Sequence, residues 1–561
     1  MAKRSKSTPV PPASAPASRL IPSLAIFVIA LLLRLLAAWQ LGSLPLSRTP
    51  QLDSAAYLMW AREIVAGGVV WPPYPEHAPG YPFFVAAVLA VSNGSLMAVR
   101  IVQAVLGAMA CVLTARVAAR TVAPRAFVWA GLLQAVYAPL IYIETALLSE
   151  AVLVFLLVLM LDQITSAARD AKSWLLSGLA LGAACIVRPT ALVLVVAFAV
   201  VLIRKHHWSR DTRRAALAFG AGVLIVAAPI VIQNWRVTGL PMIQAYGGLN
   251  TYLGNRPSGD GGARARPGGE WDRLEGEASR AAVSRNGQDR YYLQKTWSEI
   301  ADQPGAYAGL LASKLWWTLQ DDEVRDTHSY YFFADAWVPL RWLPSYGWIL
   351  ALAAAGAIAA RPREPAWLLT YAIAMLATVV LLVIGTRYRM PLVPAIIAFA
   401  GAGLAATTDA VRSRRWNTAA KLAGVVAVVW AVTEIRHDPA SHNLAEEHAL
   451  SGLSLLQEGR LAEAETACRT AIDIDPSSSL AWDGLGLVLQ RRLLRNEARL
   501  AFERAVQINE SNATAWLHLG YAHELLKEPD AALRAYRQAL AITPQRGDAI
   551  ALYDAARHRY R

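Results

Sequence analysis

Residues 51–82 read QLDSAAYLMWAREIVAGGVVWPPYPEHAPGYP and follow an apolar run at residues 20–41. The stretch combines charged side chains with aromatics that favour membrane interfaces, so we expect it to emerge at a bilayer surface. Asp53 stands just ahead of a short amphipathic helix, which a Gly-Gly pair ends. The prolines beyond prevent further helix, and HAPGYP (77–82) predicts a rigid turn that returns the chain to the membrane.

Composition indicates a polytopic α-helical membrane protein. Of the 561 residues, 55% are hydrophobic and only 17% are charged, so apolar segments of membrane-spanning length must make up much of the chain. The formal net charge of +13 would suggest a nucleic-acid partner in a soluble protein. Here many Arg and Lys side chains fall in short loops between apolar runs, which indicates membrane topology and no nucleic-acid partner.

The apolar runs predict about eleven transmembrane helices. The candidate spans are residues 20–42, 97–118, 125–143, 149–166, 174–187, 190–204, 215–234, 346–360, 366–384, 390–408 and 418–434. Two short helices meet at Arg188-Pro189, because this division places the basic loops on the same side as the basic N-terminus. An odd number of spans puts the termini on opposite sides of the membrane. The alternative is that the last run is an interfacial helix, which leaves ten spans and cytoplasmic repeats.

The basic N-terminus, the apolar runs and the C-terminal repeat divide the chain into three parts. They are a disordered cytoplasmic tail at 1–19, a transmembrane domain at 20–435 with external loops at 43–96 and 236–345, and a soluble repeat domain at 444–561. Within the second loop we predict a flexible Gly-rich part, Gly247–Gly269, and a helical part around 291–319. The three cysteines are far apart and lack metal-ligand spacing, so we expect them to be inert packing residues.

The repeat domain has a period of 34 residues. Glycine recurs at 452, 486 and 520, and alanine at 464, 498 and 532, with Trp482 and Trp516 matched as well. This pattern resembles tetratricopeptide repeats, an α-solenoid in which paired helices approach closely at small residues. The resemblance implies a groove that docks an acceptor or a partner protein. A purely structural cap is the alternative.

The predicted topology gathers ionisable groups at the surface opposite the basic loops. These groups are Asp53, His77, Glu144, Glu150, Arg188, Arg387 and Arg389. Guanidinium groups bind phosphate oxygens bidentately, so arginines beside a membrane helix suit the phosphate of an amphiphile. Carboxylates opposite them suit acid/base work or a divalent metal ion, for which Asp53 and Glu144 are the candidates.

Several of these residues have a structural alternative. Glu150 and Arg188 would then form only an ion pair, Arg387 would snorkel to the interface, and His77 would hydrogen-bond the turn. The acidic run 321–323 could bind a cation, although such runs are more often solvated patches. The glycine-rich GNRPSGDGG (254–262) lacks the lysine of a phosphate loop, so we interpret it as a linker.

The chain is similar, over residues 20–435, to polytopic glycosyltransferases with the GT-C fold. This group contains the protein O-mannosyltransferases of glycosyltransferase family 39 and the aminoarabinose transferases that modify lipid A. In that family an acidic residue follows the first span, and an interfacial helix and a Pro-Gly-Tyr-Pro turn come next. Here these features are Asp53, residues 54–67 and residues 79–82. An Arg-x-Arg-x-Pro stretch opens a late span, as residues 387–391 do here.

The resemblance implies a sugar donor linked to polyprenyl phosphate and used outside the cytoplasm. Asp53 would be the base that activates an acceptor hydroxyl, and Arg387 or Arg389 would hold the lipid phosphate. The remaining predicted site residues are Arg188, also at the donor phosphate, and His77, Glu144, Glu150, Tyr57 and Tyr81 in support. The chain has Ser54 where the O-mannosyltransferases have a second acidic residue, so protein mannosylation is not implied.

We therefore predict a membrane glycosyltransferase that moves a hexosyl or pentosyl group to a protein or glycolipid acceptor. We expect it in the cell inner (plasma) membrane, with Asp53 and the repeats on the extracytoplasmic, periplasmic side. One alternative is a transporter or flippase of lipid-linked sugars, which usually shows repeat symmetry between its halves. The other is a non-catalytic scaffold that presents the repeats, which would not need the charged groups to gather at one surface.

Overall fold

The computed structural model describes residues 19–68, 71–72, 74–166, 170–206, 209–262, 269–362, 364–435 and 437–560. Over these ranges the chain folds into helices and contains no β-strand, only an isolated bridge between Gly262 and Ile384. The all-α prediction is confirmed. The predicted tail at residues 1–19 lies outside the described residues apart from Arg19.

Helices of the membrane domain overlap all eleven predicted spans. They are α1 (Leu20–Leu41), α5 (Leu96–Thr121), α6 (Ala126–Val136), α7 (Ala138–Thr145), α8 (Glu150–Thr165), α9 (Ala171–Val187), α10 (Leu192–His206), α11 (Arg210–Thr238), α18 (Tyr346–Ala359), α19 (Ala366–Leu381), α21 (Val393–Arg412) and α22 (Trp416–Thr433). Within the described part of the chain, six helical segments are long and apolar enough to cross a membrane. There are seven if α6 and α7, which are bent by 54°, form one span. The apolar helices α9 and α10 are shorter, so the number of crossings stays a prediction.

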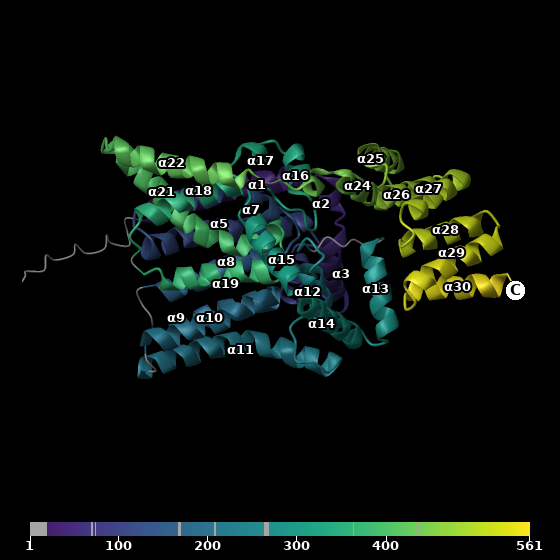
Figure 1. Ribbon diagram of the computed structural model, residues 1–561, viewed down its shortest axis with the longest axis horizontal. Helices are drawn as coiled ribbons and strands as arrows, with labels where there is room; N and C mark the ends of the chain where they lie inside the picture. Colours follow the sequence, from purple (N-terminus) through teal and green to yellow (C-terminus); the bar gives the residue numbers. More distant parts are fainter. Residues whose placement is uncertain are drawn as a thin grey trace, which may run out of the picture.

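The bundle helices lie side by side along the long axis of the molecule (Figure 1). Paired helices of the bundle approach each other closely where glycine lies at their contact. A Cβ atom on Gly178 of α9 would lie 2.1 Å from the carbonyl oxygen of Phe219 in α11. A Cβ atom on Gly356 of α18 would lie 1.9 Å from the carbonyl oxygen of Phe399 in α21. Because small residues let the backbones of membrane helices meet, α9 packs along α11 and α18 packs along α21.

The first external loop contains α2 (Pro45–Arg48), α3 (Leu52–Gly67) and α4 (Gly80–Val91). Helix α3 is the predicted short helix, but it begins at Leu52, so Asp53 lies in its first turn and not ahead of it. It ends at Gly67 as expected, and Gly68 follows with a φ of 89° that suits glycine. The predicted turn is shorter than we expected, because α4 already begins at Gly80. Pro82 lies in the first turn of α4, where a backbone N–H has no helical partner to lose.

The second external loop is more ordered than the sequence suggested. Its helices are α12 (Gly247–Asn255), α13 (Glu270–Ala281), α14 (Arg285–Asp302), α15 (Pro304–Thr318), α16 (Tyr330–Ala336) and α17 (Pro339–Trp342). The prediction of flexibility throughout Gly247–Gly269 is wrong for α12, because Leu249 and Leu253 are buried in a cluster with Leu274 and Tyr292. The predicted helical part at 291–319 is confirmed, with a break at Gln303, just before Pro304.

The repeat domain forms three helix pairs and a final helix. They are α24 (Ala445–Gln457) with α25 (Leu461–Ile474), α26 (Ser479–Arg491) with α27 (Arg495–Ile508), α28 (Ala513–Leu525) with α29 (Pro529–Ile542), and α30 (Gly547–Arg559). The repeated alanines Ala464, Ala498 and Ala532 are fully buried, as the period predicted. A Cβ atom on Gly486 would lie 2.4 Å from the ring of Phe502, so small residues do mark the close contacts.

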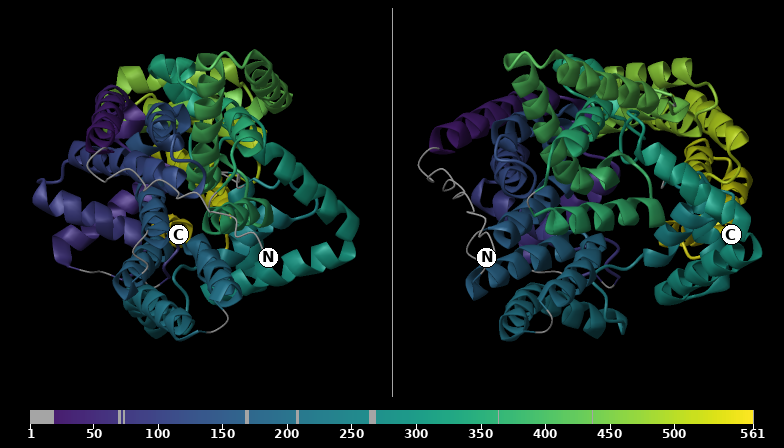
Figure 2. Two further views of the ribbon diagram at one scale, coloured as in Figure 1. Left: turned by 90° about the vertical axis from the view of Figure 1, so that its left-hand side faces the viewer. Right: turned by 60° about the vertical axis from the view of Figure 1, so that its left-hand side comes forward.

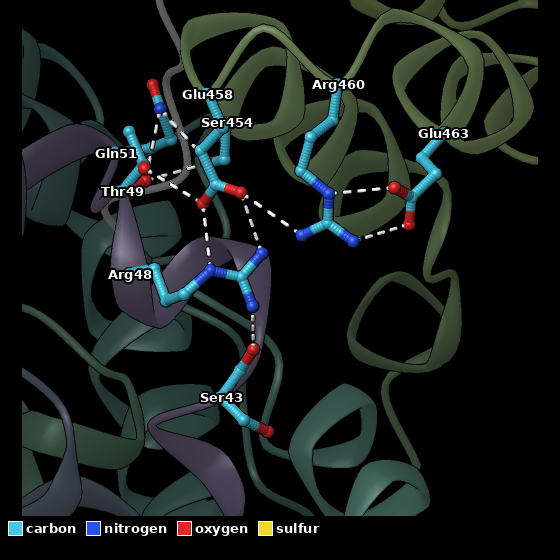
Figure 3. Close-up of polar contacts among 8 residues, drawn as sticks. All are labelled: Ser43, Arg48, Thr49, Gln51, Ser454, Glu458, Arg460 and Glu463. Atoms are coloured by element: carbon cyan, nitrogen blue, oxygen red, sulfur yellow. Dashed lines mark hydrogen bonds and ion pairs between the residues drawn. The ribbon is translucent and has the colours of Figure 1, made fainter.

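The repeats rest on both external loops. Arg48 of α2 forms an ion pair of 2.7 Å with Glu458, and Gln51 donates to the Ser454 hydroxyl at 3.2 Å (Figure 3). Farther along, Asp272 of α13 accepts the backbone N–H of Ala513 at 3.0 Å. The right-hand view of Figure 2 shows the yellow repeats beside the teal helices of the second loop. The repeat domain is therefore docked beside the loop that carries Asp53.

Candidate active site

A cavity of about 640 Å³ opens between the first external loop, the bundle and the second external loop. Five predicted site residues line it, namely Asp53, Tyr57, His77, Arg188 and Arg387. Its volume is in the range of cavities that hold small-molecule ligands and cofactors. The structure thus joins residues that lie more than 300 positions apart in the chain.

Asp53 lies in the first turn of α3 and accepts a hydrogen bond from Arg387 Nη1 at 2.7 Å. Leu52 directly before it has a φ of 55°, a left-handed conformation that costs free energy in a residue with a branched side chain. Burial alone would raise the pKa of Asp53, but the charges of Arg387, His77 and Arg188 lower it to about 2. Asp53 is therefore an ionised carboxylate at neutral pH, and its side chain remains one-third exposed to the cavity.

Arg387 sits between two carboxylates. It pairs with Asp53 on one side and with the buried Asp326 on the other. The loop that carries Asp326 is fixed to the start of the late span, since Thr386 N–H donates to the Val324 carbonyl at 3.0 Å. Sequence reasoning missed Asp326, because neither its spacing nor its surroundings in the chain point to Arg387.

Arg188 is the second cation of the cavity. Its guanidinium pairs with the buried Glu150 of α8 and lies 4.7 Å from the centroid of the Tyr388 ring. The guanidinium of Arg387 lies 5.1 Å from the same ring on Tyr388. The two cations thus flank one aromatic ring, which is a further site residue that the sequence did not assign. The predicted pairing of Glu150 with Arg188 is present, and Glu150 itself does not line the cavity.

Of the two predicted tyrosines, Tyr57 lines the cavity and Tyr81 lies behind it. The ring of Tyr57 makes edge contacts with His77, at a centroid distance of 4.9 Å, and with Tyr81, at 5.0 Å. Tyr81 is fully buried, and its hydroxyl donates to Gln103 at 2.7 Å. Tyr81 therefore positions Tyr57 and does not reach the cavity.

Apolar side chains complete the cavity. Leu153 and Leu157 lie one and two turns into α8, and Met375 and Val379 lie on α19. The cavity thus extends from the charged groups into the apolar helical bundle. Such a lining suits an amphiphile whose charged group is held at Arg387 and whose chain follows α8 and α19.

Glu144 and Arg389 were predicted at the site, but they do not line the cavity, and neither do Glu150 and Tyr81. Glu144 is fully buried and pairs with Arg34 of α1, which also donates to the Ala135 carbonyl at 3.1 Å. Arg389 is buried against Glu323 at 2.7 Å, and it donates to the carbonyl oxygens of Gln320 and Asp322. Both side chains are used inside the protein, and neither lines the cavity.

The position of Glu144 decides whether it could share a metal ion with Asp53. Glu144 cannot share an ion with Asp53, because its carboxylate is bound to Arg34 outside the cavity. One oxygen of Asp53 already accepts from Arg387. The two predicted candidates therefore do not fit a common metal site.

Replacing Glu144 by Leu should lower the free energy of unfolding by about 3–5 kcal/mol, because it leaves the Arg34 charge buried without a partner. Thermal unfolding in detergent measures this loss. The double variant Arg34→Leu, Glu144→Leu should be more stable than Glu144→Leu alone, since an apolar pair leaves no buried charge. A Glu144→Leu protein of native stability without transfer activity would contradict the structural role.

The comparisons with known proteins concern both halves of the chain. Residues 76–233 match the family model described as dolichyl-phosphate-mannose-protein mannosyltransferase, and residues 448–478 and 513–546 match tetratricopeptide repeat models. The chain thus joins a segment similar to this transferase family to segments similar to tetratricopeptide repeats. Of the cavity residues, His77 and Arg188 fall inside the matched segment, whereas Asp53 and Arg387 fall outside it.

Solved structures are similar to separate parts of the chain. The oligosaccharyltransferase AglB from the archaeon Archaeoglobus fulgidus, solved with an inhibitory peptide and a dolichol-phosphate, is 12% identical with a TM-score of 0.42. The match covers 78% of this chain and 58% of that chain. The tetratricopeptide domain of Arabidopsis OM64 is 20% identical with a TM-score of 0.20, over 20% of this chain and 95% of that one. MamA is 24% identical with a TM-score of 0.20, over 22% of this chain and 71% of that chain. No curated protein matches the chain in sequence.

Proposed function

We propose that the chain is a membrane glycosyltransferase that transfers a sugar from a polyprenyl-phosphate donor to an acceptor hydroxyl in this cavity. The observation that carries the proposal is the pair of Asp53 and Arg387 at the wall of a cavity with an apolar extension. The family match over residues 76–233 supports glycosyl transfer from a lipid-phosphate donor.

The chemistry needs a base and a charge clamp. Arg387 and Arg188 hold the phosphate of the donor, because guanidinium groups form short charge-assisted hydrogen bonds to phosphate oxygens. Asp53 accepts the proton of the acceptor hydroxyl as that oxygen forms its bond to the anomeric carbon of the sugar. The bond from that carbon to the phosphate oxygen breaks, and the lipid phosphate leaves with the electron pair, stabilised by the two cations.

The pair of Asp53 and Arg387 also explains how a weak base becomes effective. In the structure the Arg387 charge holds the pKa of Asp53 at about 2, which makes the carboxylate a poor proton acceptor. A donor phosphate competes for the same guanidinium and carries negative charge towards Asp53. Both effects raise the basicity of Asp53 when donor is bound.

The test is incubation of the purified protein with polyprenyl-phosphate sugars labelled in the sugar. Release of lipid phosphate, dependent on Asp53, supports a transferase. Movement of intact labelled donor across vesicles without release would support a flippase. A protein that neither binds nor consumes the donor would be a scaffold, and that outcome would overturn the proposal.

Topology is a further part of the proposal. The cavity and the repeats face the extracytoplasmic side of the cell inner membrane, where the repeats dock the acceptor or a partner protein. The basic short loops support this orientation, and contacts such as Arg48 with Glu458 hold the repeats beside the Asp53 loop.

Alkaline phosphatase fused after Arg561 should be active in cells, because this enzyme folds only outside the cytoplasm. A fluorescent protein that matures only in the cytoplasm, fused at the same position, should stay dark. The reverse pattern would place the repeats in the cytoplasm and contradict the proposed orientation.

A further inference from the structure

Where the transmembrane domain gives way to the repeats, the chain brings together a carboxylate and two imidazoles. Asp322 belongs to the second external loop, and His437 and His442 belong to the linker that follows α22. One ligand atom from each lies within 4.8 Å of the other two. Within the described ranges this is the only group of three such side chains that close together.

His442 and Asp322 have nearly the spacing of two ligands on one metal ion. Nε2 of His442 lies 2.9 Å from Oδ1 of Asp322. Ligand atoms around a tetrahedral Zn²⁺, at bond lengths of about 2.0–2.1 Å, are about 3.3 Å apart, so a small rotation of either side chain would admit an ion. His437 and His442 are exposed and Asp322 is buried, so an ion can reach the site from solvent.

Neighbouring groups orient the carboxylate. Oδ2 of Asp322 accepts the backbone N–H of Asp438 at 2.5 Å, and the Tyr331 hydroxyl donates to Oδ1. The Tyr331 ring stacks on His442 at a centroid distance of 3.8 Å. Such outer contacts fix the direction of a ligand and are typical of protein metal sites.

The surrounding charge favours a cation. Asp321, Glu434 and Asp438 add carboxyl groups to that of Asp322. Glu434 interacts with both Asp321 and Asp322, so negative charge is concentrated there. A divalent ion would neutralise part of it.

We propose that Asp322, His437 and His442 bind a divalent transition-metal ion of the Zn²⁺ type. Two imidazoles with one carboxylate suit Zn²⁺, Co²⁺ or Ni²⁺, whereas Mg²⁺ and Ca²⁺ require mostly oxygen ligands. Three protein ligands leave a fourth position for water. The ion would tie the linker of the repeats to residues 320–326, the segment that holds Arg387 through Asp326 and Arg389 through Glu323.

Co²⁺ binding to the full-length protein, purified without a polyhistidine tag and stripped with a chelator, tests the proposal. We expect one equivalent of Co²⁺ to give the visible absorption of a tetrahedral N/O site, to be displaced by Zn²⁺, and to persist in millimolar Mg²⁺. His437→Ala and His442→Ala should each weaken Co²⁺ binding at least ten- to a hundred-fold, as even outer contacts of a metal site contribute that much.

His448→Ala is the matched control, since His448 lies on the neighbouring α24 and is not part of the group. It should bind Co²⁺ as the wild type does. His437→Ala is the decisive variant because its side chain is exposed and its loss leaves no cavity. Native Co²⁺ affinity in the His437→Ala, His442→Ala double variant, or no Co²⁺ binding by the folded wild type, would overturn the proposal.

Discussion

Asp53→Asn should reduce sugar transfer by about 10²–10⁴-fold while the protein keeps its fold, because a positioned general base contributes a factor of that size. Asparagine keeps the size of the side chain and cannot take up the proton of the acceptor. The side chain is one-third exposed to the cavity, so the substitution opens no space in the core. Release of lipid phosphate measures the loss, and thermal unfolding checks the fold.

Glu76→Gln is the matched control for this experiment. Glu76 also lines the cavity, and none of the cavity arginines forms an ion pair with it. Its amide variant should keep transfer within a few fold. If Asp53→Asn kept full activity, or if both variants lost it equally, Asp53 would not be the base.

The low pKa of Asp53 makes the stability of the folded protein depend on pH in strong acid. A carboxyl group whose pKa is lower in the folded protein stabilises it at pH values above its unfolded pKa of about 3.9. That contribution disappears as the pH falls through about 2. Between pH 5 and 8 the resting charge of Asp53 is therefore constant.

Sequence reasoning found the helices and the repeats because both leave a periodic signal. Apolar runs of spanning length and the 34-residue period of Gly452, Gly486 and Gly520 depend on composition along one segment. The position of Asp53 in the loop after the first apolar run was readable for the same reason. Its contact with Arg387, 334 residues later, was not predicted, because topology and the family resemblance placed both residues only at the same surface.

Topology fixes the side of the membrane and leaves the direction of each side chain open. Glu144 and Arg389 were expected at the site, yet each turns into the protein towards a distant partner. Glu144 meets Arg34, 110 residues earlier, and Arg389 meets Glu323 of a loop with no regular pattern. Asp326 was missed for the same reason. Helix α12 was not predicted, because a glycine-rich sequence suggests flexibility. The segment is ordered because Leu249 and Leu253 pack in a buried cluster.

Substituting the two arginines of residues 387–391 one at a time best distinguishes a role in donor binding from a role in stability. The family resemblance implied that Arg387 or Arg389 would hold the lipid phosphate. In the structure Arg387 lines the cavity that we propose holds the donor, whereas Arg389 is bound to the backbone of residues 320–322. Arg387→Lys should therefore weaken the binding of polyprenyl phosphate about 10–100-fold, since it removes one or more charge-assisted hydrogen bonds of about 1.5–3 kcal/mol each.

Arg389→Lys should lower the stability of the protein more than its affinity for the donor. Lysine cannot hold Glu323 and the carbonyl oxygens of Gln320 and Asp322 in one plane, so the buried Glu323 loses part of its compensation. We expect a lower unfolding temperature with donor affinity near that of the wild type, whereas Arg387→Lys changes the affinity more than the stability. Binding of labelled polyprenyl phosphate and thermal unfolding, measured on the same samples, distinguish the two. Weakened donor binding in a stable Arg389→Lys protein, with native affinity in Arg387→Lys, would exchange the two roles and refute the cavity as the donor site.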